Sequence, residues 1–400
     1  MSDETATYII AEIGTSHGGS LEKAYKLIDA AKKAGADCAK FQWVYADEIL
    51  HPKTGYVQLP TGSISLYERF KSLEQPVSFY KKVQVYTKEQ GLDFGCSPFG
   101  IKSLRKLYSL KPDMIKIASP ELNHYPMLNE LVKLETCLFS KRIPVVLSSG
   151  VSLMSDIEKA LQILKPLYTT PGAVKKLRSH KTDNRTSTQK KIDDTGKHKL
   201  PPLSLLHCIT SYPAPETEYN LSTLVTLSQK FGIPTGVSDH SLDPLLVPLI
   251  SVAAGGTIIE KHITLSKETD GLDDPVALTP DEFADMTQKV RDIANLDHDM
   301  LIAELSDMFG EEMLETIMGD GEKKLAPSEK QNYTRTNRSI HVMNDMKIGQ
   351  KIRKKDIAVL RTEKILTPGM SPEFFHDIIG KKLKINVSAG SGLLQNMISD

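Results

Sequence analysis

Short apolar, β-branched runs alternate with helical stretches through the first three quarters of the chain. Such runs predict buried strands, and they lie at Tyr8–Ile13, Cys38–Trp43, Leu92–Cys96, Met114–Ala118, Pro144–Leu147, Leu203–Ile209, Thr235–Val237 and Thr257–Ile259. Among the helical stretches Leu21–Lys33 is the clearest, with Ser20 as N-cap and Gly35 just past its end. Strands alternating with helices over about 290 residues predict a (β/α)8 barrel, or TIM barrel. An open doubly wound sheet is the competing fold, but the glycine-rich phosphate turn expected after its first strand is missing.

Two segments break this alternation. Residues 169–199 are polar and rich in lysine, with almost no apolar periodicity, which predicts a mobile insertion in the barrel. The pattern turns helical again over Met300–Met318 and then passes into a polar linker. Beyond the linker, alternating runs separated by glycines predict a small β-rich domain with strands at Ser339–Met343, Ile357–Thr362 and Lys384–Val387. We therefore divide the chain into a barrel (1–300), a helix and linker (301–337) and a small C-terminal domain (338–400).

The charges of the chain are balanced, since its 400 residues include 50 Lys and Arg and 50 Asp and Glu. A neutral chain gives no overall electrostatic reason to expect a nucleic acid or an anionic membrane as a partner. There is no signal-peptide pattern at the start and no apolar run long enough to span a bilayer. The cysteines are scattered without CxxC spacing, which indicates reduced core thiols. We expect a cytoplasmic protein.

Two of the predicted strands run into polar residues and end at a histidine, His240 and His262. An apolar helical stretch, 244–254, separates them, so the two strands should be parallel neighbours whose carboxyl ends meet at one edge of the sheet. Two histidines at that edge can share a metal ion, although they can also be hydrogen-bonded residues at the edge of a core. An open site completed by oxygen ligands suits Mn²⁺, with Mg²⁺ or Co²⁺ as alternatives, better than a closed structural zinc site.

Further polar residues collect at the ends of the other predicted strands. Lys40 and Lys116 lie within apolar runs and need an anionic partner to stay charged there. Serine and threonine hydroxyls follow several of the same strands, and lysines with hydroxyl donors suit a phosphate or carboxylate ligand. The alternative is that these lysines form structural ion pairs with Glu12 and Glu121.

The motifs at these strand ends, taken together, resemble the N-acetylneuraminate (sialic acid) synthases. They are Tyr8-Ile9-Ile10-Ala11-Glu12-Ile13-Gly14, Lys40-Phe41-Gln42, Ser97-Pro98-Phe99, Lys116-Ile117-Ala118-Ser119-Pro120-Glu121, Leu206-His207-Cys208, Tyr212-Pro213, Ser238-Asp239-His240 and Glu260-Lys261-His262. Arg338-Ser339-Ile340 and Asp345-Met346-Lys347-Ile348-Gly349 resemble the antifreeze-like (SAF) domain of the same family. The family condenses phosphoenolpyruvate with a 2-acetamido sugar aldehyde, which gives a 2-keto acid and phosphate.

The resemblance implies a role for each matching residue. The divalent metal would be held by His240 and His262. Phosphoenolpyruvate would be held by Lys40, Ser97, Lys116, Ser119, Ser148 and Ser238. Glu121 would orient or deprotonate the attacking water, and Glu12 would lie against the sugar and the metal. Gln42, Tyr212 and Asp273 would contact the sugar. Arg361 matches an arginine that the SAF domain inserts into the partner subunit's barrel, which implies a domain-swapped homodimer.

The sequence departs from the family pattern near the sugar. Ser16-His17-Gly18-Gly19 replaces Asn-His-Asn-Gly, Gly271-Leu272-Asp273 replaces Gly-Pro-Asp, and Thr210-Ser211 stands where an asparagine is common. Arg361 is followed by Thr362-Glu363-Lys364 instead of Pro-Gly. A legionaminate or pseudaminate synthase acting on a 2,4-diacetamido sugar is therefore a close alternative. Synthases of octulosonate or heptulosonate phosphates lack a fused SAF domain, which counts against them. A catalytically silent sugar-binding descendant is the non-enzymatic alternative.

Overall fold

The computed structural model describes residues 7–59, 62–137, 142–168, 199–269, 271–363 and 365–399. The predicted insertion at 169–199 lies outside these residues except for its last one. Within the described parts of the chain, no helix combines the length and the apolar character needed to cross a membrane.

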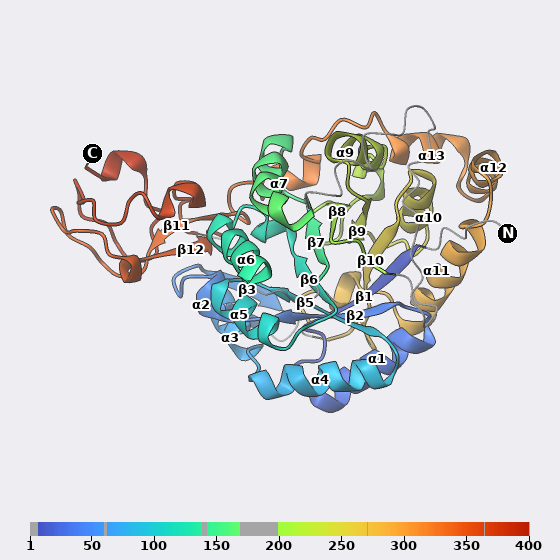
Figure 1. Cartoon of the computed structure of the whole chain (residues 1–400), viewed down its shortest axis with the longest axis horizontal. Coiled ribbons are helices and arrows are strands. Elements are labelled where there is room, and N and C mark those ends of the chain that lie inside the picture. The colour runs from blue at the N-terminus through green and yellow to red at the C-terminus, as the bar shows by residue number, and fades with distance from the viewer. Residues whose placement is uncertain are drawn as a thin grey trace.

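Eight parallel strands close into a barrel in the order β1-β10-β9-β8-β7-β6-β5-β2 (Figure 1). Their bounds are β1 Tyr8–Gly14, β2 Cys38–Trp43, β5 Asp93–Pro98, β6 Met114–Ile117, β7 Val145–Ser148, β8 Leu203–Cys208, β9 Thr235–Asp239 and β10 Ile258–His262. Each predicted strand is present, so the predicted TIM barrel is confirmed. The two histidine-bearing strands extend further than predicted, because polar residues such as Ser238 and Lys261 still pair along the ladder.

Helices surround the barrel (Figure 1). They are α1 Leu21–Lys33, α4 Val77–Glu89, α5 Ile101–Ser109, α6 Tyr125–Cys137, α7 Met154–Tyr168, α9 Thr223–Phe231, α10 Leu246–Ala253 and α11 Pro280–Ile293. Helix α1 begins where the Ser20 hydroxyl accepts a hydrogen bond from the Lys23 backbone amide. It ends before Gly35, whose φ of 81° favours glycine. Its buried face consists of Ala24, Leu27, Ile28 and Ala31.

The connection from β2 to β5 contains elements that the sequence pattern does not predict. Helix α2 (Ala46–Ile49) leads into an antiparallel hairpin, β3 (Tyr56–Leu59) and β4 (Gly62–Ser65), and then into α3 (Leu66–Ser72). The pattern missed these elements because they are short and largely polar. They are held by a separate apolar cluster in which Val44, Ile49, Leu66 and Phe99 pack together beside the barrel.

The predicted helical stretch at 300–318 consists of two helices, α12 (His298–Phe309) and α13 (Glu311–Met318). Gly310 separates them with a φ of 84°, a conformation that favours glycine and ends α12.

The C-terminal domain lies at one end of the barrel, beyond α6 and α2 (Figure 1). Its two predicted first strands are present as the antiparallel pair β11 (Arg338–Val342) and β12 (Ile357–Arg361). The third predicted strand, at 384–387, is wrong, because Val387 forms only an isolated bridge to Met346. The domain has its own buried core, which includes Ile340, Ile352, Leu383 and Leu393.

Candidate active site

The interior of the barrel is built in layers, because alternate residues of a strand point to the same face. A buried apolar cluster contains one residue from each of several strands, Ile10, Cys38, Met114, Val146, Leu206 and Ile258. Two positions further along these strands stand Glu12, Lys40, Lys116, Ser148, Cys208 and Glu260. Since the carboxyl ends of all eight strands face the same way, the apolar layer forms the floor of the site and the polar layer lies above it.

Four buried charges form one cluster on this floor. Lys40 Nζ lies 2.5 Å from Glu12 Oε2 and 3.6 Å from Glu260 Oε2, and Lys116 Nζ lies 2.6 Å from Glu260 Oε1. Strands β6 and β10 are not neighbours in the sheet, so the Lys116–Glu260 pair crosses the barrel interior. Two lysines and two glutamates balance each other, which is what burial of charge requires.

The pKa values within this cluster follow from burial and from the neighbouring charges. Burial opposes the charge on Lys40, but Glu12 and Glu260 raise its pKa to about 12. Burial likewise opposes the charge on Glu260, and Lys116 and Lys40 lower its pKa to about 2. Burial raises the pKa of Glu12 and lowers that of Lys116. Glu260 is thus the carboxylate that both lysines hold ionised.

The serines predicted to bind phosphoenolpyruvate are all buried, and two of them contact the charge cluster. The Ser97 hydroxyl lies 3.3 Å from Lys40 Nζ, and the Ser238 hydroxyl donates to Glu260 Oε1 at 3.0 Å. Ser119 accepts a 3.0 Å hydrogen bond from the Gly150 amide. The buried Ser148 hydroxyl has no hydrogen-bond partner within the described residues. These hydroxyls leave donors for an anion near the two lysines.

His240 and His262 lie side by side, with ring centres 5.6 Å apart. His240 Nδ1 lies 2.8 Å from the Ile209 carbonyl oxygen, which can only accept, so Nδ1 donates to it and Nε2 is the nitrogen that a metal could bind once it has lost its proton. Nε2 faces the Tyr212 hydroxyl at 3.2 Å. A metal bound through a ring nitrogen stands roughly 3 Å from the ring centre, so two rings at this separation can share one ion.

The pKa values of the two histidines are shifted in opposite directions. Although burial lowers it, the pKa of His240 is raised to about 9 by Cys208, whose sulfur lies 3.7 Å from Nδ1. Burial and the neighbouring charge of His240 lower the pKa of His262 well below its usual value. Within the described residues, no group of three or more His, Cys, Asp or Glu side chains is arranged to hold a metal. A metal ion at this pair stays a prediction.

The residues predicted to contact the sugar surround this pair. Gln42 donates to Glu12 Oε1 at 2.8 Å, and Asp273 Oδ2 lies 4.0 Å from His262 Nδ1. The Tyr212 ring stacks on His240 with centres 4.2 Å apart, and Tyr212 is 48% exposed. An exposed aromatic ring beside buried polar groups offers a surface on which a sugar can rest.

Glu121, which ends a 3₁₀ turn (Ser119–Glu121) after β6, does not pair with Lys116. The alternative that the lysines form ion pairs with Glu12 and Glu121 is therefore right for Lys40, which pairs with Glu12. It is wrong for Lys116, because closure of the barrel brings Glu260 to Lys116. The Oε1 atom of Glu121 instead accepts from Arg338 Nη2 at 2.7 Å and from Arg361 Nη2 at 2.8 Å. Both arginines come from the C-terminal domain of the same chain, so within this single chain the Arg361 contact needs no partner subunit.

In the Ser16–Gly19 segment, Ser16 departs from the family pattern and His17 keeps it, and the two side chains have distinct environments. Ser16 donates to Asp274 Oδ1 and Thr269 to Asp274 Oδ2, which ties the loop after β1 to the loop after β10. His17 packs on Phe79 and accepts a hydrogen bond from the Gly19 amide. Burial lowers its pKa to about 4. His17 is thus a neutral turn residue in this structure.

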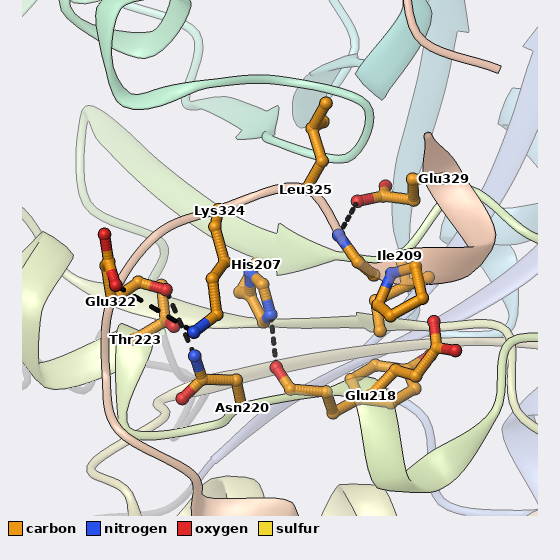
Figure 2. Close-up of a pocket in the computed structure, with 12 residues that line it drawn as sticks. His207, Ile209, Glu218, Asn220, Thr223, Glu322, Lys324, Leu325 and Glu329 are labelled. Atoms are coloured by element: carbon orange, nitrogen blue, oxygen red, sulfur yellow. Dashed lines mark hydrogen bonds and ion pairs between the residues drawn. The ribbon is translucent and has the colours of Figure 1, made fainter. Parts of the chain in front are cut away.

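A small pocket lies beside the end of β8, under the linker (Figure 2). Figure 2 shows His207, Asn220 and Thr223 near the linker residues Glu322, Lys324, Leu325 and Glu329. Glu329 lines this pocket. Its Oε1 also accepts hydrogen bonds from the Val151 amide at 2.6 Å and from the Thr210 amide at 2.7 Å. The linker thereby fixes the loops after β7 and β8.

Sequence reasoning missed three residues that complete the site: Glu260, Arg338 and Glu329. Glu260 and Arg338 stand inside motifs that were singled out, and the two-residue spacing of Glu260 from Ile258 could have placed it in the polar layer. No local pattern marks Glu329, because its partners are 119 and 178 residues away in the sequence.

Comparison with known proteins agrees with this arrangement. The profile of the NeuB family matches residues 27–300, and the profile of the SAF domain matches residues 337–399. An N,N'-diacetyllegionaminic acid synthase of Legionella pneumophila is 30% identical over 97% of this chain and 93% of its own length. An N-acetylneuraminate-9-phosphate synthase of Drosophila melanogaster is 28% identical over 98% of this chain and 96% of its own.

The fold is also shared with a solved structure, the spore coat polysaccharide biosynthesis protein SpsE of Bacillus subtilis. The two superpose with a TM-score of 0.74 and 27% sequence identity, over 99% of this chain and 96% of that one. With a closed eight-stranded barrel, a polar layer at its carboxyl end and a SAF domain behind it, this chain belongs to the NeuB family.

Proposed function

We propose that the protein condenses phosphoenolpyruvate with an N-acetylated amino-sugar aldehyde to give a nonulosonic acid and phosphate. The observation that carries the proposal is the pair of buried lysines, Lys40 and Lys116, which lie among hydroxyl donors beside two histidines on one barrel floor. Buried lysines whose charge is balanced by glutamates are an uncommon feature of a barrel core and suit an anionic substrate.

Lys40 and Lys116 would bind the carboxylate and phosphate of phosphoenolpyruvate, with Ser97, Ser119, Ser148 and Ser238 as hydroxyl donors. Before substrate arrives, Glu12 and Glu260 compensate the lysine charges. The substrate anion would replace part of that compensation, so the lysines need not move far from their present positions. This arrangement keeps the site folded in the absence of substrate.

The metal that His240 and His262 would hold is Mn²⁺ or another octahedral divalent ion, which polarises a carbonyl when bound. With Nε2 of His240 free for the metal and Tyr212 stacked on its ring, the aldehyde end of the sugar would lie between the histidines and Asp273. Gln42 and Glu12 would contact the same sugar from the neighbouring strands.

In the reaction, C3 of phosphoenolpyruvate forms a bond to the aldehyde carbon, whose oxygen becomes a hydroxyl. Water then adds to C2, and the bond from C2 to the phosphate oxygen breaks. Glu121 would orient that water or accept its proton, a role that suits a carboxylate fixed in place by two arginines. The products are the 2-keto acid and inorganic phosphate.

Two acceptors are candidates. An N-acetylmannosamine-like sugar follows from the resemblance to sialic acid synthases. A 2,4-diacetamido sugar is favoured by the 30% identity to an N,N'-diacetyllegionaminic acid synthase and by the changed residues near the sugar.

The test is phosphate release from purified protein with Mn²⁺, phosphoenolpyruvate and a panel of N-acetylmannosamine, its 6-phosphate and a 2,4-diacetamido-6-deoxy sugar. His240→Ala should abolish release, whereas His298→Ala, at an exposed position on α12, should not. Release that a chelator stops and Mn²⁺ restores would support the metal assignment. A folded protein that releases no phosphate with any acceptor would contradict the proposal and favour a sugar-binding descendant.

A further inference from the structure

Arg338 is the most fully enclosed arginine of the site. Its side chain is 0% exposed, whereas that of Arg361 is 12% exposed. Both come from β-strands of the SAF domain, where they face each other across the β11–β12 pair. The difference in exposure separates their roles, because only Arg361 has a side chain that a ligand can reach from the mouth of the barrel.

The protein itself uses every nitrogen of the Arg338 guanidinium. Nε and Nη2 donate to Glu121 Oε1 at 3.2 and 2.7 Å, and Nη2 also donates to the Phe99 carbonyl at 2.7 Å. Nη1 donates to the Glu48 carbonyl at 2.5 Å and to the Val359 carbonyl at 3.3 Å. A guanidinium with all its donors engaged has none left for substrate.

The backbone of Arg338 is held as firmly as its side chain. Its amide donates to Asn123 Oδ1 at 2.9 Å, and its carbonyl accepts from Asn123 Nδ2 at 2.8 Å. Arg338 therefore contacts the loops after β2, β5 and β6, and it connects all three to the first strand of the SAF domain.

Glu121 is held through one of its two oxygens. Oε1 receives Arg338 and Arg361, while Oε2 is buried and has no hydrogen-bond partner within the described residues. Because both arginines lie on one oxygen, the other oxygen keeps its lone pairs for a ligand. The two arginines and one carboxylate also leave a net positive charge at the mouth.

We propose that Arg338 is a positioning residue, which holds the Glu121 carboxylate in a fixed direction and so makes the docked SAF domain part of the catalytic machinery. This rests on the proposed function, in which Glu121 acts on the attacking water. Without Arg338 the carboxylate keeps only Arg361, whose side chain is partly exposed, so its direction is held less firmly.

The experiment compares Arg338→Met and Arg338→Lys with Arg353→Met in the full chain. Arg353 is a matched control, because it is a SAF arginine that is 58% exposed and pairs only with Asp356 within the described residues. The two Arg338 variants should lose about 100-fold or more in kcat, the worth of a positioned proton-transfer group, while KM for phosphoenolpyruvate changes little. The control should keep both constants.

A further readout separates positioning from simple support of the fold. In Arg338→Ala, added guanidinium at millimolar concentration should restore part of kcat, and methylammonium should not. An unchanged kcat in folded Arg338→Met would overturn the proposal.

Hydrogen exchange tests, without any need for catalysis, whether Arg338 holds the turn after β6. In Arg338→Met, amides of the Ser119–Asn123 turn should exchange faster than in the wild type, whereas Arg353→Met should leave them unchanged. If the wild type releases no phosphate, the proposed function fails. Faster exchange in this turn would still support the contacts by which Arg338 holds it. Unchanged exchange in the turn would show that Arg338 does not hold it.

Discussion

Lys116 reaches Glu260 across the barrel interior, and Lys40 lies between Glu260 and Glu12. Each residue of this cluster is nearly inaccessible to solvent, so removal of one charge leaves another without compensation in a medium of low polarity. The individual charges are therefore tied to the stability of the empty protein as well as to the binding of substrate.

Glu260→Gln should lower the free energy of unfolding by about 3–5 kcal/mol, the cost of breaking a buried pair from one side. Phosphoenolpyruvate should raise the melting temperature of this variant more than that of the wild type, because the ligand restores the missing negative charge. Glu22→Gln removes an exposed pair with Lys26 and serves as the control. Equal shifts by phosphoenolpyruvate in Glu260→Gln and wild type would argue against ligand anions at the two lysines.

His341 gives the SAF domain a predictable sensitivity to acid. It is buried in the core, with Nδ1 2.9 Å from the Gly390 carbonyl and Nε2 2.9 Å from the Ser339 hydroxyl. Burial lowers its pKa from 6.5 to about 4. Between these two pH values the unfolded chain binds a proton at His341 that the folded chain does not bind. The contribution of neutral His341 to the free energy of unfolding is therefore complete above pH 6.5 and is lost as the pH falls towards 4.

The full loss of this contribution lowers the free energy of unfolding by about 3 kcal/mol, because each unit of pKa difference is worth about 1.36 kcal/mol. Denaturant unfolding between pH 7 and 4 should show a shallower decline in His341→Gln than in the wild type. His376→Gln, at an exposed position of the same domain, is the control. A decline of equal steepness in His341→Gln would show that His341 is not responsible.

At the scale of elements, the strands hold the charge cluster, and other parts of the chain hold the loops that follow the strands. Glu329 of the linker binds the amides after β7 and β8. The turn after β7 is also tightly packed, since a Cβ on Gly150 would stand 2.2 Å from Thr210 Oγ1 and 2.8 Å from Ser119 Oγ. Only glycine fits there without displacing neighbours.

Gly150→Ala should therefore destabilise the protein by about 1–3 kcal/mol, the usual cost of overpacking, and should weaken phosphoenolpyruvate binding through Ser119. Because the shorter distance is to Thr210 Oγ1, Thr210→Ala in the same chain should recover part of both losses. A double-mutant cycle by chemical denaturation measures the coupling. Strict additivity of the two changes would contradict the contact on which this prediction depends.

At the scale of the whole molecule, the SAF domain completes a site whose floor belongs to the barrel. The contact from Arg361 to Glu121 is made within the chain described here. A domain-swapped homodimer, as the family resemblance implies, stays a prediction, and it would make the same contact between two chains.

Mixed dimers test the swap. Glu121→Gln and Arg361→Met should each be inactive alone. If the domains are exchanged, a mixed dimer has one site with both native residues, so random re-association should recover about a quarter of wild-type activity. Mixing two samples of the same variant is the control. No recovery from verified mixed dimers would show that each barrel uses its own SAF domain.

The sequence by itself determined the barrel, the strand ends and the residues that stand there. Alternation with a period of two puts Glu12, Lys40, Lys116 and Glu260 in one layer, because side chains two apart share a face of the strand. The polar strand ends also indicated the histidine pair before the fold was known. These are local properties, and local patterns are enough to specify them.

The tertiary structure alone decided which charges meet. Lys116 pairs with Glu260, 144 residues away, because closure of the barrel puts β10 opposite β6. Glu121 is instead held by Arg338, 217 residues away, because the SAF domain docks on the loops after β2, β5 and β6. Such partners are set by packing between distant segments, which no periodicity along the chain records.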